Sequence, residues 1–414
     1  MFSGRKALTA AVAVAAAALT AAGCGSSSGS PTTPAGGSSS ASQKLTIGVL
    51  VDDTGAAAST NKSAINGIKA GIQYAARNGY TIKYVLADTQ TSPTTALSAA
   101  QKLVTQDHVT AVIAQSALTF IAAPYLAAHN VPVIGSGSDG PEWSTTLSMF
   151  PVLGALHQTK VATTVGQFFK ARGVTTVGTI GYGASPQSAA GAKSSAASAQ
   201  AAGLKVGYVN AQFPLGSTDV GPVSLAMKDA GVNGVTSATA PNTSFALITA
   251  LRQQGVDLKA ALLPVGYGGD LLGAGPGATA AAQNVYFSLA YEPVEMQSAA
   301  TKQFVSDLGA TGTTGAPTYA EYNGYASIGL LVRGLKDAGG APSSATLITA
   351  LSKVHDWGAL GLLGGRKIDI NDRENIIAGV DNCVWITQFE GSTFRLVAGA
   401  DPVCGAEVKG VAVS

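Results

Sequence analysis

Residues 45–88 read LTIGVLVDDTGAAASTNKSAINGIKAGIQYAARNGYTIKYVLAD, and this stretch alternates apolar runs with an amphipathic segment. The two end runs, LTIGVLVD and TIKYVLAD, are short and rich in β-branched residues, which predicts two buried strands. Between them Ile65, Ile68 and Ile72 recur at the spacing of one helix face, which predicts a helix. A strand, a helix and a second strand in this order indicate a parallel sheet with helices packed on its faces.

The same alternation continues along the chain and restarts once, after a less regular stretch near 153–156. A helix is predicted at 157–172, where the second series begins. Further strands are predicted at 109–115, 131–137, 175–181, 234–239 and 261–266. The long helix predicted at 317–340 and the strand-like pieces RKIDI, CVWITQFE and TFRLV are too few to close a third core. We therefore expect an α/β fold with two doubly wound parallel-sheet lobes.

The composition argues against a nucleic-acid partner. Of 414 residues, 46% are hydrophobic and only 12% are charged, against roughly 25% charged in an average protein. The formal net charge is +2 and no long run of Lys or Arg occurs, so the clustered cations that a nucleic acid requires are missing. We expect a globular protein that binds no nucleic acid.

Residues 1–23 are typical of a secretory signal peptide. Arg5 and Lys6 form a basic start, an apolar run follows, and small residues lead to Cys24. The apolar run is shorter than the roughly 20 residues that span a bilayer comfortably, although an uncleaved anchor is the alternative. We therefore expect the protein to be exported.

The end of this segment, LTAAGC at 19–24, resembles the lipobox of bacterial lipoproteins, in which the cysteine is diacylated and becomes the new N-terminus. Ala21 stands where that pattern usually has Leu. A thiol beside a cleavage site has a use as a lipid anchor, whereas a free exposed thiol in an oxidising compartment is a liability. Residues 24–43 are then a lipidated flexible tether, which spans about 24 Å as a random coil.

Two further cysteines, Cys383 and Cys404, lie in the exported part of the chain, where pairing is favoured. We expect a disulfide between them, worth roughly 3 kcal/mol; two buried free thiols are the alternative. Enzyme chemistry is hard to build, because the four histidines are dispersed and no metal-ligand or phosphate-loop motif occurs. We expect no enzyme activity, no cofactor and no metal site.

Several segments, taken in order, carry a family resemblance. They are IGVLVDDTG, INGIKAGIQYAARNG, VLADTQTSPTTALSAAQKLVTQDHVTAVIAQSA, VPVIGSGSDGPEW and, late in the chain, AEYNGYASIGLLVRGLKDAGG. From about residue 45 to 397 the chain resembles the leucine/isoleucine/valine-type solute-binding proteins of ABC transporters. The resemblance implies the type I periplasmic binding protein fold, in which two lobes joined by three crossings hold a ligand in the cleft between them.

In that fold residues 44–154 plus 290–362 form lobe 1, and 155–289 plus 363–414 form lobe 2. The resemblance implies the extracytoplasmic component of an ABC importer, which captures a small polar molecule, such as an amino acid or amide, and delivers it to the permease subunits. Such proteins are commonly tethered lipoproteins in actinobacteria, so we expect a monomer anchored through Cys24 to the outer face of the cytoplasmic membrane. A ligand-sensing receptor that feeds a signalling partner is the alternative, because the fold alone does not separate the two.

The family holds its ligand with polar residues in the loops after several lobe 1 strands. Ser116 and Thr119 keep hydroxyls where the family has a serine run, whereas Ala117 and Leu118 depart from it. Trp143 is expected to stack on the ligand. The remaining lobe 1 candidates are Asp53, Ser136, Ser138 and Asp139. The alternatives are that the serines cap the helices that follow them and that Asp53 begins a turn.

In lobe 2 the family uses a tyrosine in the loop after the first strand, and Tyr182 is the nearest match here. Its amine-binding acid lies in the loop that reads GYGGDLLG at 266–273, where Tyr267 and Asp270 are the candidates. A glycine takes the acidic position and Asp270 follows two residues later; the alternative for Asp270 is a helix N-cap. The tyrosines that recur every three residues from 319 to 325 are predicted as core, because a stripe at helical spacing usually faces the core.

Overall fold

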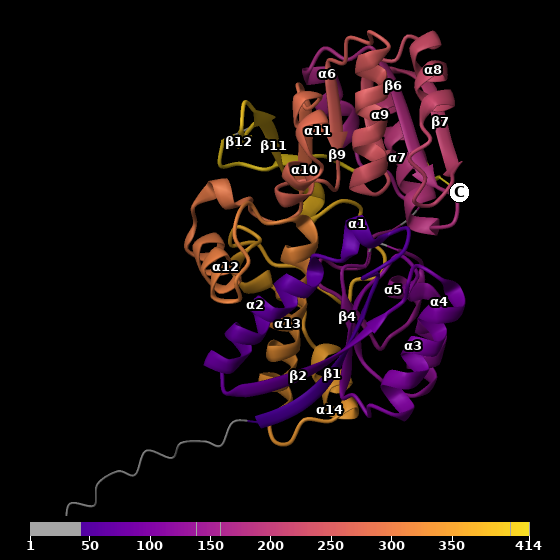
Figure 1. Ribbon diagram of the computed structural model, residues 1–414. Helices are drawn as coiled ribbons and strands as arrows, with labels where there is room; N and C mark the ends of the chain where they lie inside the picture. The colour runs from indigo at the N-terminus through magenta and orange to yellow at the C-terminus, as the bar shows by residue number, and fades with distance from the viewer. Residues whose placement is uncertain (1–42, 138, 158, 398, 414) are drawn as a thin grey trace, which may run out of the picture. The chain divides into compact units, whose positions relative to one another are not determined.

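The structure is a computed structural model that describes residues 43–413, except 138, 158 and 398 (Figure 1). The predicted signal peptide, Cys24, the tether up to residue 42 and Ser138 lie outside the described residues. Among the helices that are described, none is long and apolar enough to cross a membrane. The described chain builds two sheets, each with its own helices.

The first sheet has five strands in the order β2-β1-β3-β4-β5, and neighbouring strands run parallel. The strands are β1 (Gln43–Val51), β2 (Tyr80–Asp88), β3 (Ala111–Gln115), β4 (Val133–Gly135) and β5 (Met149–Pro151). Val49 packs in one hydrophobic cluster with Ile68, and its neighbour Leu50 packs in another with Leu103. Both faces of β1 are therefore covered, which explains why it reads as a continuous apolar run.

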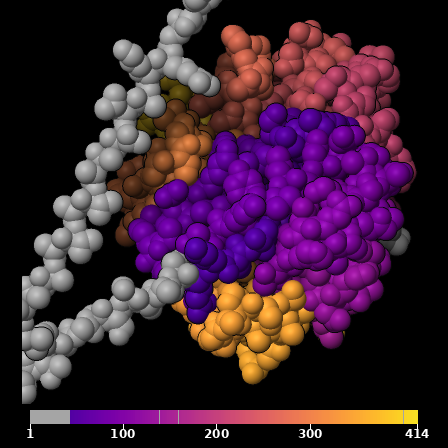
Figure 2. Space-filling model, turned by 60° about the horizontal axis from the view of Figure 1, so that its bottom comes forward, coloured from indigo at the N-terminus to yellow at the C-terminus, as the bar shows by residue number. Residues whose placement is uncertain are grey.

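Helices from the beginning of the chain and from near its end cover this sheet. The early ones are α1 (Ala58–Asn61), α2 (Ala64–Arg77), α3 (Pro93–Thr105), α4 (Thr119–Ala128) and α5 (Glu142–Thr145). The late ones are α12 (Ala299–Ala310), α13 (Tyr319–Ala338) and α14 (Ser344–Leu351). Helices α12 and α13 both pack on α2, and α14 packs on α13. In Figure 2 the orange late segment lies directly against the indigo and purple surface of the early one.

Glycines allow α13 to lie close against α2. A Cβ atom on Gly67 would lie 1.9 Å from the carbonyl oxygen of Glu321, and one on Gly324 would lie 2.3 Å from the carbonyl oxygen of Ala64. Tyr322 and Tyr325 on the same helix are 0% and 2% exposed, so the predicted core role of this tyrosine stripe is confirmed for them. The approach of α13 is how a late segment of the chain completes the first lobe.

The second sheet contains eight strands, with the path β12-β11-β10-β9-β8-β6-β7 and β13 paired to β11. Its parallel strands are β6 (Thr176–Tyr182), β7 (Lys205–Phe213), β8 (Gly234–Ala238), β9 (Ala260–Leu263) and β10 (Val285–Leu289). The antiparallel ones are β11 (Cys383–Glu390), β12 (Thr393–Leu396) and β13 (Val403–Cys404).

The helices of this second half follow its strands in the alternating order that the sequence predicts. They are α6 (Thr164–Ala171), α7 (Pro186–Ala201), α8 (Gly221–Asp229), α9 (Pro241–Gln253), α10 (Gly269–Gly273) and α11 (Pro276–Ala280). The structure thus has the expected α/β fold with parallel sheets in two lobes, to which the end of the chain adds an antiparallel edge.

Two local predictions are wrong. The piece RKIDI is not a strand, since it makes only an isolated bridge between Trp357 and Ile368. The helix predicted from residue 157 begins only at Thr164, because the preceding residues form backbone hydrogen bonds with distant segments, such as His157 N–H to the Ile376 carbonyl over 2.6 Å. Periodicity cannot detect pairing of this kind, which depends on residues far away in the chain.

The chain passes between the two sheets after β5, after β10 and before β11. We call residues 152–163 the first crossing and residues 364–382 the third crossing. Cys383 and Cys404 form a disulfide at the start of β11, which is the pairing that the sequence favours. The domain limits inferred from the resemblance remain a prediction.

Candidate functional site

The loops after β1, β2 and β3 meet around the carboxylate of Asp52, which is fully buried. The hydroxyl of Ser116 donates to it over 2.7 Å and the backbone N–H of Ala117 over 2.8 Å. Thr89, which follows β2, donates its hydroxyl to the same carboxylate, and Asn61 at the end of α1 donates its amide over 2.7 Å. Asp52 therefore holds together the edge where ligands bind in open α/β sheets.

This network accounts for two of the predicted lobe 1 residues. Ser116, 6% exposed, donates to Asp52 and accepts a hydrogen bond from the N–H of Leu118 over 3.1 Å. Thr119, 1% exposed, donates its hydroxyl to the carbonyl of Ser116 over 2.9 Å. Leu118 is the N-cap of α4 and makes no side-chain cap, so Ser116 shapes the loop instead of capping the helix.

Asp53 has a different environment from Asp52. Its backbone N–H donates to Asp88 over 3.1 Å, whereas its own carboxylate is 27% exposed and lies 3.7 Å from the Lys62 ammonium. Partial burial acts to raise the pKa of Asp88, but hydrogen bonds from Thr54, Gln90 and Asp53 outweigh it and hold that pKa below its ordinary value. An ionised Asp88 thus fixes the backbone of the loop that presents Asp53.

After β4 the chain buries two acids and an indole together. Ser136 is half-buried, and Asp139 accepts a hydrogen bond from the indole N–H of Trp143 over 2.6 Å. Trp143 is 1% exposed and packs beneath Gly135, where a Cβ atom would meet its ring at 2.6 Å. Burial and the neighbouring Asp139 raise the pKa of Glu142 to about 10. The indole that the sequence assigned to ligand stacking lies in the core under the loop.

In lobe 2, Tyr182 at the end of β6 lies within hydrogen-bond distance, 2.7 Å, of the Thr243 hydroxyl and accepts from the N–H of Ala240 over 3.1 Å. Tyr267 is 1% exposed, packs edge-on against Phe394 and donates its hydroxyl to Glu295 over 2.6 Å. Both tyrosines therefore have polar partners within the protein, and burial raises the pKa of each hydroxyl.

Asp270 is the lobe 2 acid that stands beside lobe 1. It occupies the second position of α10, whose N-cap is Gly268, so it is not the helix cap. Burial and the charge of Glu321 on α13 raise the pKa of Asp270 to about 8. Gly268 lies so close to the segment before α13 that a Cβ atom there would be 1.9 Å from the carbonyl oxygen of Pro317. Asp270 is therefore held at the junction of the two lobes.

The two lobes also touch through loops at the carboxyl ends of their strands. The hydroxyl of Ser59 on α1 donates to the Asn242 side chain over 2.9 Å. The carbonyl of Asp139 accepts from the hydroxyl of Ser185 over 3.2 Å and from the N–H of Gln187 over 3.5 Å. We call these two places the lip contacts. They bring binding-loop residues of lobe 1 against helix starts of lobe 2.

Comparison with known proteins places this geometry in a family. The family model described as periplasmic binding protein matches residues 44–393, which is most of the chain. The chain belongs to this family. Its members are solute-binding proteins and not enzymes, and they act outside the cytoplasm. Among the described residues, no group of three or more His, Cys, Asp and Glu side chains is arranged to hold a metal ion. No curated protein sequence matches the chain.

Solved structures share the fold at low sequence identity. A leucine-binding protein from Thermotoga maritima is 16% identical with a TM-score of 0.69, covering 85% of this chain and 97% of that one. A branched-chain amino-acid binding protein from Streptococcus pneumoniae in complex with isoleucine is 18% identical, with a TM-score of 0.71 and coverages of 86% and 99%. A solute-binding protein from R. palustris in complex with benzoate is 15% identical, with a TM-score of 0.70 and coverages of 90% and 98%. These similarities show the fold of this periplasmic binding protein.

The structure brings together residues that the sequence analysis did not select. Asn61 and Thr89 join Asp52 in organising the lobe 1 loops, and Ser59 and Asn242 form one lip contact. The available signal for Thr89 was its position directly after a predicted strand, where side chains gather at one sheet edge. Ser59 and Asn242 carry no such signal, because only the folded chain shows that they meet.

Proposed function

We propose that this protein is the extracytoplasmic solute-binding component of an ABC importer, which captures a small polar molecule between its lobes and delivers it to the permease. The observation that supports this most is the pair of lip contacts, which join binding-edge loops of lobe 1 to helix starts of lobe 2. Family membership supports a solute-binding role, and the fold supports a ligand that bridges two lobes.

The mechanism follows from which bonds can break. The lip contacts consist of a few hydrogen bonds: the exposed one from Ser59 to Asn242, and the two that the Asp139 carbonyl accepts from the start of α7. Helix α13, in contrast, is packed tightly on α2 within lobe 1. Opening would therefore separate the lips and leave each lobe intact. A ligand that contacts both lobes binds the arrangement with touching lips more tightly, so it shifts the equilibrium toward that arrangement.

We assign the ligand contacts to side chains that retain bonding capacity toward the junction of the lobes. Asp53 in lobe 1 and Asp270 in lobe 2 are the acidic candidates, since neither is enclosed by donors in the way that Asp52 is. Ser136 is a further candidate in lobe 1. Ser138 and Asp139, which follow it closely in the sequence, are candidates as well. Ser116, Thr119, Trp143, Tyr182 and Tyr267 would act by fixing the loops around the ligand.

Cys24 would be the lipid anchor that keeps the protein on the outer face of the membrane, with residues 24–43 as its tether. The lipobox-like segment supports this proposal. Mass spectrometry of the protein purified from membranes should find a diacylated N-terminal cysteine, and Cys24→Ser should release the protein from the membrane fraction. A Cys24→Ser protein that stays membrane-bound would contradict the anchor.

The binding role is tested by a thermal unfolding screen against amino acids, amides, small carboxylates, aromatic acids and sugars, including isoleucine and benzoate. A ligand at 100 times its dissociation constant stabilises the folded state by about 2.7 kcal/mol, which is a clear rise in Tm. We expect at least one small polar compound to raise the Tm in a saturable manner. Absence of any response, with a protein stripped of co-purified ligand by unfolding and refolding, would argue against solute binding.

A further inference from the structure

The end of the chain returns to the first crossing and pairs with it. Beyond β13 the chain runs antiparallel to residues 159–163, with a bridge between Ala162 and Glu407. The N–H of Val408 donates to the carbonyl of Val161 over 2.8 Å, and the N–H of Val413 donates to the carbonyl of Thr159 over 3.0 Å. The C-terminal segment is therefore a strand-like partner of the link between the lobes.

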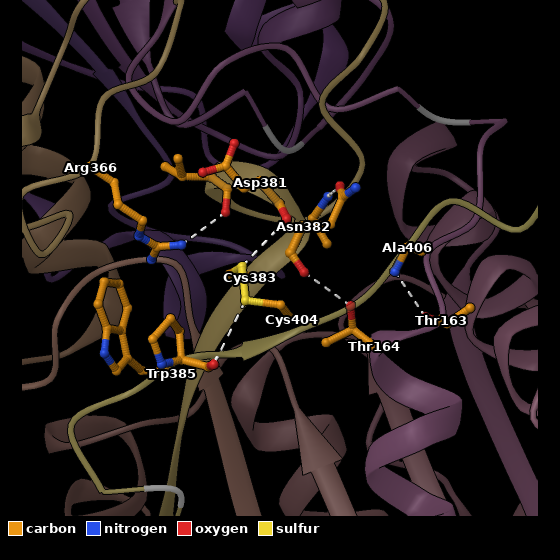
Figure 3. Close-up of a disulfide and its surroundings, with 12 residues drawn as sticks. Thr163, Thr164, Arg366, Asp381, Asn382, Cys383, Trp385, Cys404 and Ala406 are labelled. Atoms are coloured by element: carbon orange, nitrogen blue, oxygen red, sulfur yellow. Dashed lines mark hydrogen bonds between the residues drawn. A yellow bond between two sulfur atoms is a disulfide. The ribbon is translucent and has the colours of Figure 1, made fainter.

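Its attachment starts next to the disulfide (Figure 3). The carbonyl of Asn382 accepts from the N–H of Gly405 over 3.0 Å and from the hydroxyl of Thr164 over 3.1 Å. Ala406 and Thr163 exchange two further hydrogen bonds, of 2.9 and 3.0 Å. A Cβ atom on Gly405 would lie 2.3 Å from the Thr164 hydroxyl oxygen, so this close approach requires glycine.

The opposite side of the first crossing is bonded to the third crossing. The N–H of His157 donates to the carbonyl of Ile376, and the ammonium of Lys160 donates to the carbonyl of Glu374 over 2.7 Å. Gly154, with φ at +74°, packs so tightly that a Cβ atom would lie 2.0 Å from the Ile376 side chain. Residues of the first crossing are thus held between the third crossing on one side and the C-terminal segment on the other.

Little apolar burial holds the C-terminal segment in place. Residues 409–412 are exposed, and Val411 has 39% of its surface in contact with solvent. Exposed backbone hydrogen bonds at a chain end open readily unless something else fixes the segment. Here Cys404, directly before the segment, is joined covalently to Cys383 at the start of β11. The disulfide supplies the attachment that packing does not.

We propose that the Cys383–Cys404 disulfide fastens residues 405–413 as a strap across the first crossing, and that this strap restrains the opening of the two lobes. Domain opening requires changes of backbone angles in the linking segments. With residues 159–163 bonded to the C-terminal segment, and with His157 and Lys160 bonded to the third crossing, such changes fall on the part of the crossing around Gly154 unless the strap detaches. The strap therefore sets how far, and how often, the lips separate.

Hydrogen exchange followed residue by residue tests the strap directly. The N–H of Gln187 is a reporter of the lips, because it lies in the first turn of α7, where no intrahelical acceptor exists, and it donates to Asp139 across the lobes. In Cys383→Ser/Cys404→Ser we expect exchange at Gly405, Thr163 and Val408, and also at Gln187, to become at least tenfold faster. The N–H of Val112 inside the first sheet serves as the internal control and should be unchanged.

A truncated chain that ends at Gly405 separates the strap from the disulfide. It keeps the Cys383–Cys404 bond and lacks the residues that pair with 159–163, so we expect the same acceleration at Gln187 as in the double serine variant. Val411→Ser, which changes an exposed side chain of the strap, should leave every rate unchanged and is the matched control. Unchanged exchange at Gln187 in the truncated chain would overturn the proposal, and this readout stands even if the double serine variant does not fold.

Discussion

Asn61 donates a hydrogen bond to the carboxylate of Asp52 over 2.7 Å, and this contact links the end of β1 to the helix that carries Ser59. Ser59 in turn reaches Asn242 in the second lobe over 2.9 Å. The carboxylate that gathers the lobe 1 loops is therefore connected, through one short helix, to a lip contact. This connection makes Asp52 a positioning residue for both the binding edge and its closure.

Asp52→Asn should destabilise the protein by about 3 kcal/mol, because the amide NH2 group would face donors that now point at a carboxylate oxygen. The midpoint of urea unfolding measures this. Asp53→Asn is the matched control, because the same chemical change falls on a side chain that is 27% exposed; it should shift stability by no more than about 0.5 kcal/mol. Equal losses in the two variants would show that Asp52 has no special structural role.

Gly67→Ala should cost about 2–3 kcal/mol, because its Cβ atom would lie 1.9 Å from the carbonyl oxygen of Glu321 and force α13 away from α2. Gly309→Ala in α12 is the control, since a Cβ atom there meets nothing within 4 Å. Gly309 is the last residue but one of α12. Alanine is the better helix former by about 1 kcal/mol in a helix interior, so near the helix end this change should be neutral or stabilise by less than that. Thermal unfolding of both variants distinguishes the packing account from a general intolerance of glycine replacement in these helices, which would predict losses in both.

The pKa of Asp270 predicts a pH dependence with a definite sign. Its pKa rises from the ordinary 3.8 to about 8 in the folded protein, first through burial and then through the charge of Glu321. The stability that results from this raised pKa is fully present below pH 4 and is lost as the pH rises through 8. Over that range the unfolded chain has released the proton of Asp270, whereas the folded chain still holds it.

Asp270→Asn removes that loss. The rise of about four pKa units is worth about 1.4 kcal/mol per unit, so the variant should be more stable than the wild type at pH 8 by up to about 5 kcal/mol. The two should be nearly equal at pH 4, and urea unfolding at both pH values measures the difference. Asp257→Asn offers a comparison, since Asp257 lies on the surface and has its pKa lowered by Lys259. A stability difference for Asp270→Asn that does not change between pH 4 and pH 8 would contradict the assigned pKa.

Asn242→Ala removes the acceptor of the Ser59 hydroxyl and should favour lip opening. If the lip contact contributes about 1 kcal/mol to the closed arrangement, ligand affinity should fall roughly fivefold while stability stays nearly constant. Calorimetric titration with the compound that most raises the Tm gives the affinity. Gln200→Ala, at an exposed position on α7 in the same lobe, should bind the ligand as the wild type does. A similar loss of affinity in that variant would show that the lip contact is not the cause.

The parallel sheets were predictable because central strands such as β1 and β3 are buried on both faces and therefore stand out as apolar runs such as residues 45–52. The core role of Tyr322 and Tyr325 was predictable for a similar reason, since helical spacing alone indicates one face. RKIDI failed because a short alternating run also fits an irregular segment, and here it makes only the Trp357–Ile368 bridge. The prediction that a helix starts at residue 157 failed because residues before Thr164 pair with the end of the chain, which delays the start of α6.

The site was less predictable than the fold. Sequence position identified the loops after strands, but it could not tell a side chain that faces a ligand from one that holds its loop. Ser116 and Trp143 illustrate this. Ser116 bonds to Asp52, 64 positions away, and Trp143 bonds to Asp139, 4 positions away, and both hydrogen bonds depend on the folded loops. Asp52 and Asp53 are adjacent and chemically identical. Only their surroundings in the folded chain distinguish Asp53, a candidate ligand contact, from Asp52, which holds the loops together.

The most direct test of the account is a calorimetric titration of the purified chain, and of its Asp53→Asn and Asp270→Asn variants, with the compounds that raise the Tm. We predict one binding site per chain, with a negative heat-capacity change because closure buries surface. Loss of a contact from either lobe should weaken that same single site. Two independent sites, or a site that responds to changes in one lobe only, would contradict binding between the lobes.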